Sequence, residues 1–138
     1  MANQKLHSIN VTAALAAARA APLSAKKALL AALLLDAEAD RLFAASGETD
    51  ILDFRARLAA KSDALALVFA LCALRPDGPH LVTEAVQVPI ADYPGLSVQD
   101  FMVSLYNDHS VQRVRIAVGD ERHDVHEVLA AAFEALRA

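Results

Sequence analysis

The chain has 138 residues, a net charge of −4 and a hydrophobic fraction of 56%. Its length fits a single domain, residues 1–138, with a core that needs no disulfide or metal for stability. The acidic balance and the scattered lysines and arginines argue against nucleic-acid binding, which relies on a concentrated basic surface. Part of the apolar excess is alanine, and the remainder predicts an extra buried surface, most simply the interface of a homodimer.

Cys72 is the only cysteine, so no internal disulfide forms and a reducing cytoplasm is the expected compartment. It lies within an apolar run, where a thiol is usually inert. That run, residues 64–74, is far shorter than the ~20 residues needed to span a bilayer, so no membrane segment is expected. An alanine-rich chain with more arginine than lysine is typical of bacteria with GC-rich genomes.

An alanine-rich helix is predicted over residues 11–21, with Asn10 as its N-cap and Pro22 at its end. The polar residues 1–7 before it are expected to fray. Both boundaries rest on local signals alone.

Two further helices are predicted over residues 25–45 and 51–60. Ser24 is a candidate N-cap for the first, and Gly47 ends it, as glycine commonly does after a helix. Thr49 or Asp50 then caps the second. Four leucines at helical spacing are expected to form the apolar face of the first: Leu29, Leu30, Leu33 and Leu34.

The apolar run 64–74 fits either a strand or a helix, because periodicity does not separate the two in such a run. Alanine and leucine favour a helix. A fully apolar segment followed by the turn residues 75–80 instead favours a central strand. The β-branched segment 82–88 needs a pairing partner, so we predict a hairpin over 64–90 and keep the helix as the alternative.

A short helix capped by Ser97 is predicted over residues 98–106, with Phe101, Met102 and Leu105 as its buried stripe. Tyr93 and Tyr106 flank it at loop positions. Such aromatic residues either contact a partner or close the core, and the sequence leaves both interpretations open.

Residues 111–118 alternate between apolar and polar, which predicts a strand. The helix predicted over 124–137 has the most regular apolar spacing in the chain. Together the segments predict an α+β domain: about three N-terminal helices packed on a small antiparallel sheet, made of hairpin 64–90 and strand 111–118, with a C-terminal helix.

The best group of metal-ligand residue types is His123, His126 and Glu127. Histidines three residues apart on a helix share a face and can bind one metal ion. His109 or Asp108 would have to supply a further ligand through folding. The alternative is that Asp124 caps the last helix, with Glu127 at the third helical position and both histidines in solvent.

Arg113 and Arg115 project from one face of the predicted strand and are candidates for contact with an anion or an acidic partner. Arg75 or Arg122 would complete such a site. The alternative is a solvated strand face whose charges discourage aggregation at a sheet edge.

Asp36, Glu38 and Asp40 form an acidic group on the second predicted helix. Carboxylates at this spacing can share acid–base work or bind a divalent cation through oxygen. A solvated helix face is the alternative, and the glycine and spacing of an EF-hand are absent.

No motif specifies a reaction, since phosphate-binding loops and dinucleotide fingerprints are absent from the sequence. The first hypothesis is a small cytoplasmic protein without catalysis or cofactor, which binds itself as a homodimer or binds another protein. The second is a metal-dependent or small-ligand protein centred on His123, His126 and Glu127, with a metal-bound water as nucleophile.

Overall fold

Six α-helices and a three-stranded antiparallel sheet make up the part of the chain that the computed structural model describes, residues 2–138 without the side chains of residues 2–9 and 90. In chain order the elements are α1 (Ala2–Ala20), α2 (Ala25–Ser46), α3 (Ile51–Lys61), α4 (Asp63–Cys72), β1 (His80–Gln87), the 3₁₀ helix η1 (Ile90–Gly95), α5 (Val98–Tyr106), β2 (Ser110–Val118), β3 (Glu121–Asp124) and α6 (Val125–Arg137). The predicted α+β class with a C-terminal helix is confirmed.

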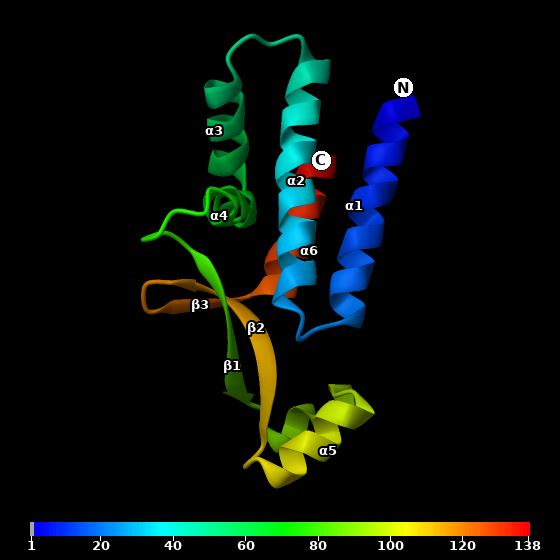
Figure 1. Cartoon of the computed structure of the whole chain (residues 1–138), viewed down its shortest axis with the longest axis vertical. Coiled ribbons are helices and arrows are strands. Elements are labelled where there is room, and N and C mark those ends of the chain that lie inside the picture. The colour runs from blue at the N-terminus through cyan, green and yellow to red at the C-terminus, as the bar shows by residue number, and fades with distance from the viewer. Residues whose placement is uncertain (1) are drawn as a thin grey trace.

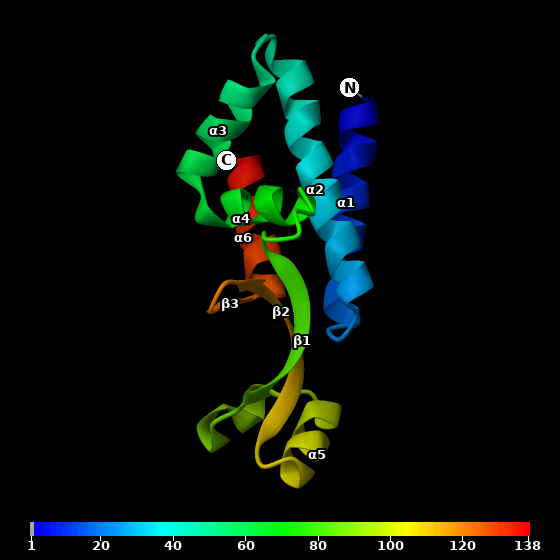
Figure 2. The same cartoon turned by 60° about the vertical axis from the view of Figure 1, so that its left-hand side comes forward.

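All the α-helices except α5 gather at one end of the molecule, and the sheet extends from them. α1 and α2 run antiparallel beside each other, α4 and α6 pack on α2 and on each other, and α3 packs on α4 (Figure 1). The β1–β2 hairpin leads away from these helices, and α5 sits at its far end (Figures 1 and 2). No helix in residues 2–138 is both long and apolar enough to cross a membrane.

The strand predicted over residues 64–74 was wrong, because this run forms α4. Ser62 is the start signal: its hydroxyl accepts a hydrogen bond from the Leu65 amide at 3.2 Å. Leu65, Val68 and Leu71 follow at helical spacing and are buried. The hairpin 64–90 therefore does not exist, and β1 finds its partner in β2 instead.

The three strands overlap over only part of their length. β1 pairs with β2 along all its residues, from His80 opposite Ala117 to Gln87 opposite Ser110. β3 pairs only with residues 115–118 of β2. Residues 83–87 and 110–114 consequently form a two-stranded ribbon. We refer to this ribbon, with η1 and α5 at its end, as the arm.

The core lies between the helices and one face of the sheet. Val114 and Ile116 of β2 are buried there, as their alternation with Arg113 and Arg115 predicts. Most of the other large buried side chains come from the helices: Val11, Leu35, Leu65, Val68, Leu71, Val125 and Leu129. The arm projects beyond this core.

Alanines, together with Leu35, supply most of the buried face of α2. Four of them are buried: Ala28, Ala31, Ala32 and Ala39. Leu30 and Leu33, expected inside, are 53% and 39% exposed. α1 packs along α2, and small side chains let two helices approach closely. The expectation was wrong for Leu30 and Leu33, because it ranked side chains by hydrophobicity and ignored their size, whereas Leu29 and Leu34 are half-buried against the core.

Most helix boundaries follow the predicted capping residues. Like Ser62 of α4, four predicted caps accept a hydrogen bond from the backbone amide three residues further on: Ser24 for α2, Asp50 for α3, Ser97 for α5 and Asp124 for α6. Gly47 ends α2 in the left-handed conformation, with φ of 79°. α1 differs from prediction, because it begins at Ala2 and not after Asn10. The helix-favouring residues before Asn10 continue the helix.

Candidate functional site

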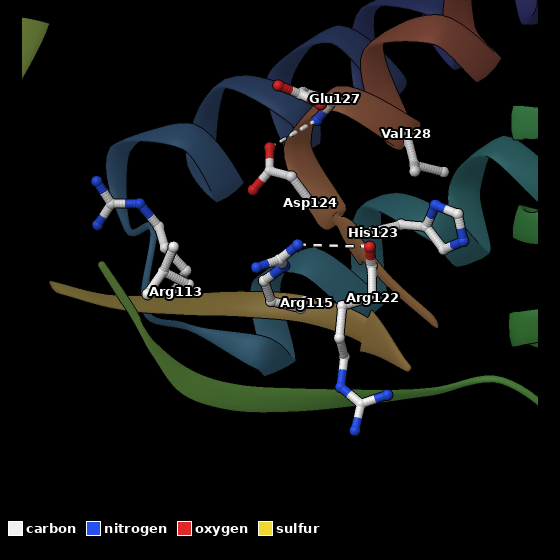
Figure 3. A pocket seen from close by; sticks show the side chains of 8 residues that line it. Arg113, Arg115, Arg122, His123, Asp124, Glu127 and Val128 are labelled. Carbon is white, nitrogen blue, oxygen red and sulfur yellow. Dashed lines mark hydrogen bonds between the residues drawn. The ribbon is translucent and has the colours of Figure 1, made fainter. Parts of the chain in front are cut away.

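Three arginines line an open pocket on the sheet face opposite Val114 and Ile116. Arg113 and Arg115 come from β2 and Arg122 from β3, and we refer to them as the arginine face. The pocket has a volume of about 410 Å³, and the first turn of α6 borders it (Figure 3). Arg122 thus joins the two predicted arginines, whereas Arg75 lies in a different part of the fold.

Each residue of the arginine face already has an acidic partner, and Arg115 and Arg122 share one. Arg113 pairs with Asp100 of α5 at 3.0 Å, and Arg122 pairs with Glu84 of β1 at 3.4 Å. Arg115 lies 3.9 Å from Glu84 and also donates a hydrogen bond to the Arg122 carbonyl (Figure 3). These pairs connect all three strands and α5, which is a structural role.

The geometry of the arginine face offers little to an anion. The three guanidinium groups point in different directions instead of converging (Figure 3). Asp124 and Glu127 line the same pocket and add negative charge. Among the described side chains, Arg115 Nε is the one nitrogen of this face that is buried without a hydrogen-bond partner. Contact with an anion or partner through Arg113 and Arg115 stays a prediction.

The candidate metal ligands come from two elements: His123 lies in β3, whereas His126 and Glu127 lie in the first turn of α6. His123 stands opposite Ile116 in the sheet, while His109 and Asp108 precede β2. Seven residues of strand span about 23 Å, so neither can supply the further ligand. Within the described side chains no three His, Cys, Asp or Glu residues come together as a metal site.

Helix capping accounts for part of the segment 123–127 without a metal. Asp124 accepts a hydrogen bond from the Glu127 amide at 3.1 Å, which confirms the predicted N-cap of α6. The His126 Nε2 atom is buried without a hydrogen-bond partner in the described structure. Metal binding at His123, His126 and Glu127 stays a prediction without a complete set of ligands.

The three acidic residues of α2 form ion pairs with two arginines. Asp36 and Asp40 both pair with Arg55 of α3, and Glu38 pairs with Arg41 one turn further along α2. Burial lowers the pKa of the Arg55 guanidinium, but its hydrogen bonds and attraction to Asp36 and Asp40 outweigh this and raise the pKa above its usual value. The group therefore joins α2 to α3 rather than forming a solvated face.

The Cys72 thiol, predicted to be inert, should be unreactive in the folded protein. Its pKa is raised to about 12, chiefly by burial and to a smaller extent by the charge of Asp36, while Arg55 opposes the rise. Because only the thiolate reacts, the folded chain at about pH 8 should resist an aromatic disulfide reagent that labels the urea-unfolded chain rapidly.

The same shift makes stability depend on alkaline pH. The unfolded Cys72 thiol loses its proton near its ordinary pKa of about 8.5, whereas the folded thiol still holds it. The stability contribution is complete below that pH and is lost as the pH rises towards about 12. Rapid labelling of the folded chain at about pH 8 would contradict this account.

The two tyrosines near α5 have different surroundings. The Tyr93 hydroxyl is hydrogen-bonded to His109 Nδ1, and its ring meets Phe101 edge-on with centroids 5.5 Å apart. Tyr93 thus helps to hold α5 on the arm. Tyr106 is 82% exposed.

The outer face of α5 is apolar and exposed. Met102 and Leu105, predicted to be buried, are 49% and 52% exposed, and Phe101 is 38% exposed. α5 turns Ser104 inward, where it is buried, and Asp100 pairs with Arg113. Four residues at helical spacing form the outward stripe: Val98, Met102, Leu105 and Tyr106. We refer to them as the α5 stripe.

Sequence reasoning recognised α5 as an apolar helix but placed its apolar face on the wrong side. The sequence position of α5, between two strands that pair with each other, was the signal that it lies at the end of a hairpin, away from the core.

Comparisons with protein-family models, with curated proteins and with solved structures found no match to this chain.

Proposed function

We propose that this protein acts without catalysis, in the cytoplasm, by binding a second copy of itself through the arm. The α5 stripe is the observation that carries the proposal, because it presents four large apolar side chains to solvent at the end of a projecting ribbon. Exposed apolar patches on otherwise polar proteins commonly mark contact surfaces.

Covering the α5 stripe would be energetically favourable. Burying one exposed leucine or methionine side chain contributes on the order of 1.5–3 kcal/mol, before the entropy of association is subtracted. An isolated two-stranded hairpin is only marginally stable in water. A partner that packs on the stripe would therefore also stabilise the arm.

Charge favours a second copy over an acidic or basic partner. Asp100 is the only charged residue of α5, and Arg113 already neutralises it. In a two-fold symmetric dimer each surface meets its own copy, so a charged surface would repel itself. The α5 stripe meets this condition because all four of its residues are uncharged.

The ribbon supplies additional surface for a dimer. A stable interface usually buries about 800 Å² on each partner, more than one short helix provides. β1 is an edge strand over its whole length, and residues 110–114 of β2 have no second neighbouring strand. Unpaired strand edges present backbone donors and acceptors that pair readily with another chain.

Light scattering on a sizing column tests the proposal directly. The wild-type chain at about 10 μM should elute with twice its monomer mass, and the M102E/L105E variant should elute as a monomer. Two glutamates buried in an apolar contact should raise the dissociation constant at least ~100-fold.

A matched control carries the same charge change on exposed leucines outside the arm. Leu30 and Leu52 lie on α2 and α3 and are 53% and 78% exposed. The L30E/L52E variant should remain a dimer. Monomeric wild-type protein at about 100 μM, or equal dissociation of both double variants, would refute self-association through the arm.

A further inference from the structure

An open groove lies where the start of α2, the end of α4 and the start of β1 meet. Its volume is about 510 Å³, and its apolar wall includes Leu29, Leu71 and Leu81. We refer to it as the leucine groove. The volume falls within the roughly 300–1,000 Å³ of small-molecule sites, whose linings are also mainly apolar.

Two cations stand beside this apolar wall without neutralising partners. Lys26 lies in the first turn of α2, and Arg75 follows α4. Neither forms an ion pair with a described side chain, and no carboxylate lines the groove. Asp77, in the same turn, lines a neighbouring hollow that Arg75 also borders, but no ion pair joins the two among the described side chains. The arginine face differs, because its three arginines all have acidic partners.

Leu74 stands at the groove in a strained backbone conformation. Its φ is 54°, a left-handed position just after a helix where glycine is the usual residue. The Leu74 side chain is 65% exposed, so burial in the core does not compensate for the strain. Strained residues persist where their surroundings or their function require them.

We infer that the leucine groove binds a single-chain carboxylate, a small anion with one flexible apolar chain. Lys26 and Arg75 would hold the carboxylate through charge-assisted hydrogen bonds. The chain would lie along the leucine wall, and Leu74 would cover it from the solvent side. This inference does not depend on self-association, since the groove and the α5 stripe lie on different elements.

Calorimetric titration with decanoate, below its micelle concentration, tests the inference. Decanoate should bind, acetate and decyltrimethylammonium should not, and affinity should rise by about fourfold for each methylene added between hexanoate and decanoate. Amide shifts in the NMR spectrum should change around the groove and not in α5. Equal binding of the cationic amphiphile would overturn the inference, as would binding only to anionic lipid vesicles.

A pair of double variants separates head-group recognition from general charge effects. K26Q/R75Q should weaken decanoate binding at least ~10-fold. R19Q/K27Q removes the same charge from exposed residues outside the groove and should bind like the wild type. Equal loss in both double variants would show that the net charge of the chain, rather than the groove, attracts the ligand.

Leu74→Gly separates binding from folding. Glycine adopts the left-handed conformation without strain, so the melting temperature should stay the same or rise. Decanoate affinity should nevertheless fall at least ~3-fold, because the cover over the chain is lost. If Leu74→Gly binds decanoate as tightly as the wild type, Leu74 does not contribute to the site. Failure of every carboxylate to bind would refute the site itself, whatever the oligomeric state.

Discussion

Arg55→Met should lower the free energy of unfolding by about 2 kcal/mol, measured by urea denaturation. Arg55 neutralises Asp36 and Asp40 of α2, and its guanidinium lies 4.1 Å from the centre of the Phe69 ring in α4. Methionine fills a similar volume but leaves two carboxylates unpaired. The expected effect is smaller than the ~3–5 kcal/mol of fully buried pairs, because Arg55 and Asp36 remain 22% and 27% exposed.

Arg57 provides the matched control, two positions further along α3. It pairs with Glu48 and Asp53, but its side chain is 50% exposed. Arg57→Met should leave the denaturation midpoint nearly unchanged, because exposed ion pairs contribute little. Equal destabilisation by both variants would mean that general charge balance, and not the contact of Arg55 with α2 and α4, stabilises α3.

Leu65→Ala should destabilise the protein by about 3 kcal/mol. Leu65 is 1% exposed and belongs to the core that α4 shares with α2 and α6. Truncation removes buried apolar contacts and leaves a cavity, since the neighbouring helices relax only partly. Thermal and urea denaturation should both show the loss.

Leu52→Ala is the control for this prediction. Leu52 is also a helical leucine, but it is 78% exposed, so its truncation should change the free energy of unfolding by less than ~0.5 kcal/mol. A small effect at Leu65 would contradict the position of α4 in the core.

Local signals predicted much of the fold. Capping by Ser24, Asp50, Ser97 and Asp124 depends on neighbouring residues only, and each cap is confirmed. The alternation in residues 111–118 likewise identified β2 and its buried face. These features follow from short-range geometry, which a single sequence records directly.

Tertiary packing decided the rest. Residues 64–74 are apolar on every side whether they form a strand or a helix, so their position among α2, α3 and α6 settles the conformation. Ser62, the N-cap of α4, is a local signal that favours the helix, and the strand prediction did not use it. The prediction of a buried stripe on α5 was wrong for a related reason. Periodicity identifies the apolar face of a helix but does not reveal whether another part of the protein covers it.

The candidate sites were less predictable than the fold. His123 and His126 are close in sequence, but a strand-to-helix junction separates them. Arg113 and Arg115 were identified correctly as neighbours on one face, yet their partners Asp100 and Glu84 come from distant segments. The leucine groove joins α2, α4 and β1, and such a combination has no signature in the sequence.

β1 connects the two surfaces to which we assign binding. Its first residues, His80 and Leu81, line the leucine groove, and the chain after Gln87 leads into α5. A strand of eight residues is a continuous connection of about 27 Å. If an occupied groove favours one arrangement of the arm, thermodynamic linkage requires pairing of the chains to change the affinity of the groove by the same factor. Ligand concentration would then alter how readily the chains pair, and protein concentration would alter how tightly the groove binds its ligand, with β1 as the connection.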